Sequence, residues 1–497
     1  MKRLSGHILL LSALLLFCSN PVDEPGRRSS GCTVFTSPDA PFSDPPSTAS
    51  IRYIITIPDT VHTSPLFTCI INSGYRFLLP VHYADNPLQQ TNGPVVRDLH
   101  ITEHDGQTIQ PSFTTVTVGP QTNTEMILPD DVAYPVTVTY SIDFSTFIPE
   151  DDSKSMPATF CNDTAFFFTG AHCFIIPEIS LSLADLWRTP LQSEIVIHKN
   201  PVVKVFGIPG TAFSCPTLYE LLFLQFSHGA PVLTCGNGGG VDFIFTNFTA
   251  TPWSAGLADS TAGLFAMVLD TLSRTYGSFS HYAIDPLPYT LAVYTLWGAL
   301  EGTFGFAVRE PFEGTDGRFC EILAHEALHH FIGIRCGDLD DPWWKEAAAA
   351  YLGLETAVNL GQYDKESFRS RMTARFYAAD SLRFRRALSD PWLRDHMFSE
   401  VLYNIAYDRG GQIMMLLDDR IRTGSGGTFT LHNAVAALCA RFAGRGFSRN
   451  DFMQVCSEFG AQGVDSVFAV YVDRSDTVPT PETLMSAFNR IDSLAAW

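Results

Sequence analysis

The spacing of apolar residues changes near position 249, and this change constrains the fold more than any other feature of the chain. Between residues 51 and 248, β-branched and aromatic residues form short runs such as IRYIITI and YPVTVTYSIDF, separated by Pro, Gly, Asn and Asp. Such runs are typical of strands. Beyond residue 249, apolar residues recur at helical spacing, as in LADSTAGLFAMVLDTLSRTYG. We therefore predict a multidomain α+β protein.

The length of the chain sets how many folding units it can hold. Its 497 residues suit two to four domains, and 45% hydrophobic residues are enough to build real cores. We expect a β-rich N-terminal domain at residues 49–248, a mixed domain at 249–390 and an all-helical domain at 391–497.

The N-terminus has the organisation of an export signal. Met1, Lys2 and Arg3 precede an apolar run at residues 8–17 that is too short to span a bilayer, so we assign residues 1–18 to the signal. Residues 19–48 are rich in Pro, Ser, Asp and Arg, which predicts a disordered tether. The sequence LLFC, ending at Cys18, resembles a lipoprotein processing site.

Two outcomes remain open for the exported chain. Cys18 carries a lipid anchor, or the protein is secreted or released into the periplasm. In both cases we expect a periplasmic or cell-surface protein. Only the lipidated form would contact the membrane, through its anchor at Cys18. The net charge of −20 argues against a nucleic-acid partner.

The remaining cysteines suit an oxidising compartment. Cys18 set aside, the chain has an even number of cysteines, which is compatible with disulfides in an exported protein. Buried free thiols are the alternative. The chain has no CxxC pair, so we do not expect a cysteine-based zinc site. Short separations suggest three local pairs: Cys161/Cys173, Cys215/Cys235 and Cys439/Cys456.

The pentapeptide HEALH, residues 325–329, is the strongest chemical signal in the chain. Residues four apart share one face of a helix, so His325 and His329 can bind the same metal ion. Glu326 lies round the helix, near enough to reach a metal-bound water, and this pattern is typical of zinc hydrolases. The alternative is an ordinary helix whose histidines are satisfied within the fold. We expect His330 to face elsewhere.

A catalytic zinc ion needs a third protein ligand and one open position. A metzincin would have Gly and His where this chain has Ile332 and Arg335, which excludes that class. Glu346 interrupts an otherwise apolar stretch on the next predicted helix. We therefore predict one Zn²⁺ per chain, bound by the two histidines and Glu346. Glu355, on the same helix, is the alternative ligand, and a solvated helix charge is the alternative role for Glu346.

The segment around Glu346 resembles a known family. WWKEAAAAY is similar to the W-x-x-E-G-[FA]-x-x-Y segment of the zinc aminopeptidases of the gluzincin group, which include aminopeptidase N and leukotriene hydrolase. Glu346 stands at their metal-ligand position and Tyr351 at their aromatic position, while Ala347 replaces the usual Gly.

A second match lies upstream of the histidines. GALEG, residues 298–302, resembles the exopeptidase motif G-x-M-E-N, or its G-G-L-E-H form in the glycyl aminopeptidase family. The resemblance implies that Glu301 binds the free α-amino group of the substrate. Gly302 departs from the Asn or His of these motifs, which puts the surroundings of the amine in doubt. A turn beside a strand is the alternative for this segment.

A third match lies downstream. YDRG, residues 407–410, resembles the Y-x-K-G segment, which implies that the Tyr407 hydroxyl donates to the oxyanion, with Arg409 keeping the positive charge. A core tyrosine is the alternative. The later helical segments are similar in order and spacing to the C-terminal region of the glycyl aminopeptidase family. Many members carry a PDZ domain, which we do not expect to be complete here.

The resemblance implies a function. We expect a thermolysin-like catalytic domain at residues 249–390 and a zinc metallopeptidase of the gluzincin aminopeptidase type. It would remove N-terminal residues, small ones such as Gly or Ala, from peptides by a metal-activated water, with Glu326 as the base. A zinc endopeptidase and a non-catalytic surface-binding lipoprotein with a peptidase-like fold remain as alternatives. The sequence does not predict the physiological substrate or the oligomeric state.

Overall fold

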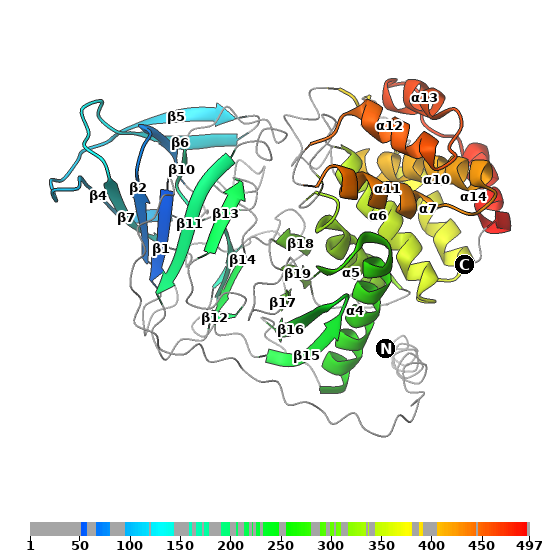
Figure 1. Ribbon diagram of the computed structural model, residues 1–497, viewed down its shortest axis with the longest axis horizontal. Coiled ribbons are helices and arrows are strands. Elements are labelled where there is room, and N and C mark those ends of the chain that lie inside the picture. The colour runs from blue at the N-terminus through cyan, green and yellow to red at the C-terminus, as the bar shows by residue number, and fades with distance from the viewer. Residues whose placement is uncertain are drawn as a thin grey trace, which may run out of the picture.

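The structure is a computed structural model of the chain, in which most of the described strands precede the helices. It describes residues 51–56, 66–79, 95–118, 121–143, 159–161, 166–170, 173–177, 190–198, 205–206, 213–217, 221, 225–228, 232–247, 255–279, 289–294, 299–302, 305–309, 317–333, 336, 343–379, 387–390, 405–443 and 446–494. The expected signal at residues 1–18, with Cys18, and the expected tether at 19–48 lie outside these residues. The described chain is a mixed helix and sheet protein with a helical C-terminal region (Figure 1).

The strands before residue 230 form three sheets in the described part of the chain. A six-stranded sheet has the order β13-β11-β1-β2-β7-β4, and two four-stranded sheets have the orders β10-β3-β6-β5 and β12-β14-β9-β8. Their bounds are β1 (Ile51–Thr56), β2 (Leu66–Ile71), β3 (Arg76–Leu78), β4 (Val95–Thr102), β5 (Ser112–Val118), β6 (Gln121–Ile127), β7 (Val136–Asp143), β8 (Thr159–Cys161), β9 (Phe166–Thr169), β10 (Ile176–Pro177), β11 (Pro190–His198), β12 (Val205–Phe206), β13 (Phe213–Thr217) and β14 (Gln225–His228).

Alternating residues of the six-stranded sheet form the core of this β-rich part. Phe67 of β2 and Tyr140 of β7 stack with ring centroids 5.4 Å apart. The buried hydroxyls find backbone partners, because Tyr53 donates to the Ile175 carbonyl at 2.7 Å and Tyr140 donates to the Cys173 carbonyl at 2.6 Å. Each of these buried tyrosines thus keeps its polar end satisfied, as burial of a tyrosine requires.

The later strands form the sheet that carries the helical half. Its order is β15 (Val232–Gly238), β16 (Val241–Asn247), β17 (Tyr289–Tyr294), β19 (Gly305–Arg309) and β18 (Ala299–Gly302). Strands β16, β17 and β19 run parallel, while β15 and β18 are antiparallel edges. Helix α4 (Ala255–Tyr276) packs against β15, and α5 (Arg318–His329) packs against β18 and β19.

Helix α6 lies at the centre of the helical half, between α5 and the later helices (Figure 1). Its Trp343 and Trp344 are fully buried, and Trp344 contacts the rings of Phe447 and Phe452 at centroid distances of 4.9 and 5.7 Å.

None of the described helices is both long and apolar enough to cross a membrane. The bounds are α6 (Trp343–Asn359), α7 (Lys365–Ala379), the π-helix η5 (Ile405–Gly410), α10 (Gly411–Ser425), α11 (Leu431–Arg441), α12 (Arg449–Glu458), α13 (Val464–Val467), the π-helix η6 (Phe468–Val472) and α14 (Pro481–Leu494).

The α5 and α6 backbones approach closely at Gly353. A Cβ atom at this position would lie 3.0 Å from the carbonyl oxygen of Glu321 and 3.0 Å from the backbone nitrogen of His325. These neighbours are backbone atoms of α5, so they can yield only if the whole helix shifts. Gly353 therefore permits the short separation between the two helices beside His325.

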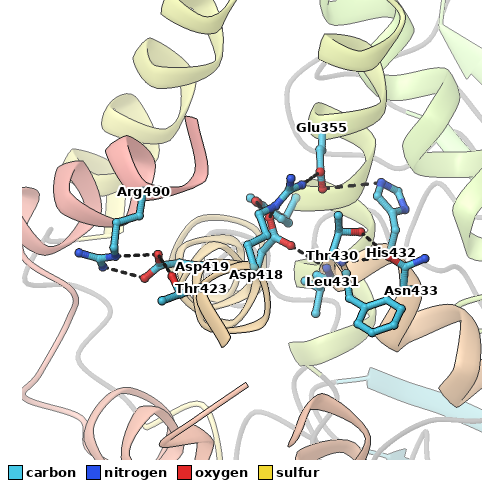
Figure 2. Close-up of polar contacts among 12 residues, drawn as sticks. Glu355, Asp418, Asp419, Thr423, Thr430, Leu431, His432, Asn433 and Arg490 are labelled. Carbon is cyan, nitrogen blue, oxygen red and sulfur yellow. Dashed lines mark hydrogen bonds and ion pairs between the residues drawn. The ribbon is translucent and has the colours of Figure 1, made fainter. Parts of the chain in front are cut away.

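A buried group of charges joins α6 to α10. Arg422 donates through NH2 to Glu355 of α6, and its Nε donates to Asp418 at 2.7 Å. Asp418 also accepts from the Tyr351 hydroxyl at 2.8 Å and from the Leu431 backbone N–H at 2.6 Å. Figure 2 shows Asp418 pointing from α10 toward Leu431, at the start of α11. One carboxylate therefore binds three different helices together.

His432 borders this group of charges. It lies 3.7 Å from Glu355 and pairs through Nδ1 with the hydroxyl of Tyr276 at 2.9 Å. Burial, followed by the positive charge of Arg422, lowers the pKa of His432 to about 3, so the ring stays neutral. Burial, followed by the nearby Asp418, raises the pKa of Glu355 to about 8, although Arg422 acts in the opposite direction.

The cysteines correct part of the disulfide prediction. The predicted pairs Cys161/Cys173 and Cys439/Cys456 are wrong, because Cys173, Cys439 and Cys456 are free and buried. The thiol of Cys439 instead lies 3.3 Å from the Phe331 carbonyl. A short separation along the sequence shows that two cysteines could meet, but not which way their side chains point. The side chains of these free cysteines point into the core. Cys235 is disulfide-bonded, and its pairing with Cys215 stays a prediction.

We expect Gly353→Ala to destabilise the protein, although alanine is the better helix former by about 1 kcal/mol. Overpacking costs about 1–3 kcal/mol, which outweighs that gain. The matched control is Gly263→Ala on α4, where an added Cβ meets nothing within 4 Å. It should raise the free energy of unfolding by about 0.5–1 kcal/mol. Denaturant unfolding measures both, and equal stabilisation by the two changes would contradict the crowding at Gly353.

We expect Asp418→Asn to lower the free energy of unfolding by about 3–5 kcal/mol, because it leaves Arg422 with one buried carboxylate fewer. The control is the same change at Asp476, whose ion pair with Arg474 is exposed on both sides, with 56% of the Arg474 side chain and 64% of the Asp476 side chain accessible. An ion pair between exposed side chains contributes little to stability, so this variant should unfold nearly as the wild type does. A similar loss of unfolding free energy in both variants, measured by chemical unfolding, would show that the contribution of the ion pair does not depend on its burial.

Candidate metal centre

The two histidines of HEALH lie on the same face of α5, as the spacing predicts. Their Nε2 atoms are 2.9 Å apart and their rings are almost perpendicular, at 86°. Both residues are buried, with 7% of His325 and 1% of His329 exposed. Two buried imidazoles therefore present one nitrogen each to the same point.

Glu346 reaches this point from the first turn of α6. Its Oε2 atom lies 3.4 Å from Nε2 of His325 and 3.4 Å from Nε2 of His329. The Glu346 side chain is 19% exposed, more than that of either histidine, so the cluster opens toward solvent on this side. Among the described residues, these three form the group whose donor atoms lie within 4.8 Å of one another and could hold a metal ion.

The donor set suits zinc. Tetrahedral zinc with ligands at about 2.0–2.1 Å would space its donor atoms about 3.3–3.4 Å apart. This spacing is close to the two nitrogen–oxygen distances and longer than the 2.9 Å between the two nitrogens. His329 has the required tautomer, because its Nδ1 lies 3.3 Å from the Ile332 carbonyl, which can only accept a hydrogen bond. A neutral ring that donates from Nδ1 keeps the lone pair of Nε2 for a metal ion.

The cluster also keeps its carboxylate ionised. Burial alone would raise the pKa of Glu346. When His329 is protonated, its positive charge and the hydrogen bonds of both histidines outweigh burial and hold this pKa well below its ordinary value. Glu346 is therefore an anion, the form in which a carboxylate binds a cation.

Glu326 lies beside the cluster and not within it. It is buried, with 5% exposed, and its Oε1 atom is 4.0 Å from Nε2 of His325. The helix therefore places one carboxylate next to the position that the three donor atoms surround. This is the placement that the sequence pattern requires of a base.

Tyr407 approaches the same point from η5. Its hydroxyl donates to Oε2 of Glu346 at 2.5 Å and lies 3.4 Å from Nε2 of His325, and its ring stacks on the His325 ring at 5.3 Å. The sequence predicted a helix here but not its π geometry. π-helical turns inside longer helices are frequent at functional sites.

Arg409, two residues further on, points away from the cluster. Its NH2 group donates to the carbonyls of Tyr471 at 2.7 Å, Arg474 at 2.5 Å and Thr477 at 3.0 Å. The charge noted in the YDRG segment thus ties η5 to η6 and to the chain that follows it. The Arg409 side chain thereby holds the backbone segment that carries Tyr407.

The remaining candidates lie elsewhere. Glu301 is on the edge strand β18, which packs against α5, but the position of its side chain lies outside what the structure describes. Glu355 belongs to the buried group around Arg422 and not to the cluster. His330 is fully buried, and its ring faces that of Phe279 at 6.3 Å. One neighbour was missed by sequence reasoning: Lys345, a lysine inside an apolar run, which lies 3.8 Å from Oε1 of Glu346.

Comparison with known proteins supports this fold. No protein-family model and no curated protein matches the sequence. By structure, the chain is similar to the aminopeptidase N family protein of Idiomarina loihiensis, with a TM-score of 0.64 over 88% of this chain and 78% of that chain, at 14% identity. It is also similar to the M1 zinc metallopeptidase of Deinococcus radiodurans, with a TM-score of 0.53 over 88% of this chain and 96% of that chain, at 16% identity. A mutant of the Deinococcus protein has been crystallised with a Tyr-Ser-Ala substrate. At these identities the likeness establishes the fold, and the chain folds as these metallopeptidases do.

Proposed function

We propose that this chain is a zinc-dependent aminopeptidase. The observation that carries the proposal is the single Glu346 oxygen that lies 3.4 Å from both histidine nitrogens, with the Glu326 carboxylate 4.0 Å from one of them. Two imidazoles, one carboxylate ligand and a separate carboxylate base are the components of zinc peptidases. The likeness in fold to zinc metallopeptidases supports the same activity.

The ion would be held by His325, His329 and Glu346. Zinc bound there would supply a Lewis acid that polarises the scissile carbonyl and lowers the pKa of water. Glu326 would accept the proton of the attacking water, since its carboxylate is buried next to the site. It would then return this proton to the leaving amine.

Tyr407 is proposed to stabilise the transition state. Its hydroxyl lies at the edge of the cluster, and it would donate to the carbonyl oxygen as negative charge develops there. One well-placed donor of this kind contributes about 3–4 kcal/mol. The ring stack on His325 and the anchor at Arg409 hold the tyrosine in place before substrate arrives.

The substrate would be a peptide with a free amino terminus. The peptide seen on the Deinococcus protein supports this substrate class. Glu301, on the edge strand against α5, would bind the α-amino group, and small first residues such as Gly or Ala follow from the resemblance of GALEG to the glycyl aminopeptidase motif. The export signal proposed at residues 1–18 would place this activity in the periplasm or at the cell surface.

The first test is the hydrolysis of Gly- and Ala-amide reporters by the purified protein, with bound zinc quantified. We expect activity in the wild type, and a loss of about 10²–10⁴-fold in kcat in Glu326→Gln with zinc retained, because the general base is removed and the ligands are not. Equal activity in both proteins would reject Glu326 as the base. A wild type that binds no zinc would reject the proposal as a whole.

The same assay separates an aminopeptidase from an endopeptidase. A peptide with an acetylated N-terminus removes the ammonium group that Glu301 would bind. An aminopeptidase should leave the blocked peptide intact and cleave the free one. Cleavage of both at internal bonds would establish an endopeptidase and overturn the role of Glu301.

We expect Tyr407→Phe to lower kcat by about 10²–10³-fold with little change in KM, because the lost hydroxyl acts mainly in the transition state. The control is Tyr75→Phe, which removes the hydroxyl of a tyrosine that is 56% exposed in the β-rich part. A steady-state comparison of the two variants measures the effect. An unchanged kcat in Tyr407→Phe would leave Tyr407 as a packing residue.

A further inference from the structure

Lys345 is a buried cation in a helix that is otherwise apolar. The residue is only 3% exposed, and Trp344 before it and Ala347, Ala348 and Ala349 after it are fully buried. Lysine is almost never buried unless its charge is paired, because removing an ammonium group from water is strongly unfavourable. A lysine held in this position therefore needs a compensating interaction, and the nearest metal-ligand candidate supplies one.

The backbone after α5 leaves room for the lysine stem. A Cβ atom at Gly333 would lie 2.8 Å from Cε and 3.2 Å from Cδ of Lys345. Gly333 also has a φ of +121°, which side-chain-bearing residues rarely adopt. The stem thus packs over a glycine in the turn that follows His329, and the packing directs the ammonium group toward the cluster.

The two oxygens of Glu346 have different partners. Oε2 faces both histidines at 3.4 Å and accepts from Tyr407, whereas Oε1 lies 3.8 Å from Nζ of Lys345. Adjacent residues on a helix point about 100° apart and do not normally face each other. The ion pair between Lys345 and Glu346 therefore requires the lysine to bend back along the helix, and it separates the roles of the two oxygens.

We propose that Lys345 is a positioning residue that holds Oε1 of Glu346, so that Glu346 binds the metal ion through Oε2 alone. The inference rests on the metal site of the proposed function. Ligation by one oxygen leaves a coordination position open, which a catalytic zinc site requires. Partners that orient a metal ligand in this way typically change metal affinity by about 10–100-fold.

Simple electrostatics predicts the opposite effect of Lys345 on zinc binding. A positive charge near a divalent cation repels it, so removal of the ammonium group would strengthen zinc binding if charge alone mattered. If Lys345 orients the ligand, its removal weakens zinc binding instead. The sign of the change in zinc affinity thus separates the two accounts.

The experiment compares the full-length wild type with Lys345→Met, which keeps an unbranched stem over Gly333 and removes the ammonium group. Zinc affinity is measured by competition with a chelator, and the thermal unfolding of the metal-free proteins is measured alongside. We expect zinc binding about 10–100-fold weaker in Lys345→Met. We expect metal-free unfolding at an equal or higher temperature, because the variant no longer buries a cation. The control is Lys365→Met, whose lysine is 50% exposed and pairs with Asp492, and its zinc affinity should match the wild type.

Unchanged or tighter zinc binding in Lys345→Met would overturn the inference and leave the proposed function intact. Parallel losses of zinc affinity and of metal-free stability would also overturn it, because they assign Lys345 a structural role. If Lys345→Met does not fold, Lys345→Gln replaces it, and failure of both variants to fold would likewise assign Lys345 a structural role. A wild type that binds no zinc rejects the proposed function itself, an outcome distinct from all of these.

Discussion

The contact between α5 and α6 is the constraint on which the rest of the site depends. His325 and His329 come from one helix and Glu346 from the other, so their distances follow from how closely the two backbones cross. The crossing is close because Gly353 has no side chain to separate α6 from the backbone of α5. Burial of both tryptophans at the start of α6 then fixes how that helix is rotated. Helix packing therefore sets the distances among the three metal-ligand candidates.

Much of this arrangement could be predicted from the sequence. The change from strand to helix spacing near residue 249 matches the order of elements in part, because α4 begins at Ala255 but β17, β18 and β19 follow it. HEALH predicted two nitrogens on one helical face, and the structure brings both within 3.4 Å of the carboxylate that the apolar run around Glu346 singled out. These predictions succeeded because they rest on helical periodicity and on a charged residue in an apolar segment. Both are visible in a single chain.

Other features had no such signature. The π-helix that carries Tyr407 depends on hydrogen bonds one residue longer than those of an α-helix, and no residue type specifies that choice. A lysine in an apolar run looks the same in sequence whether it extends to solvent or bends inward, so the place of Lys345 could not be predicted. The pairs Cys161/Cys173 and Cys439/Cys456 failed for a similar reason. Separation along the chain says how far two cysteines can reach and not which way their side chains point.

The contacts of Arg409 bear on when the site is completed during synthesis. The metal-ligand candidates and Glu326 all precede residue 347, but Arg409 is fixed by the carbonyls of Tyr471, Arg474 and Thr477, which come much later in the chain. A nascent chain would therefore have the two histidines and Glu346 well before the segment that steadies Tyr407 has left the ribosome. A chain shortened by proteolysis before Tyr471 would keep its donor atoms but lose the support for its tyrosine.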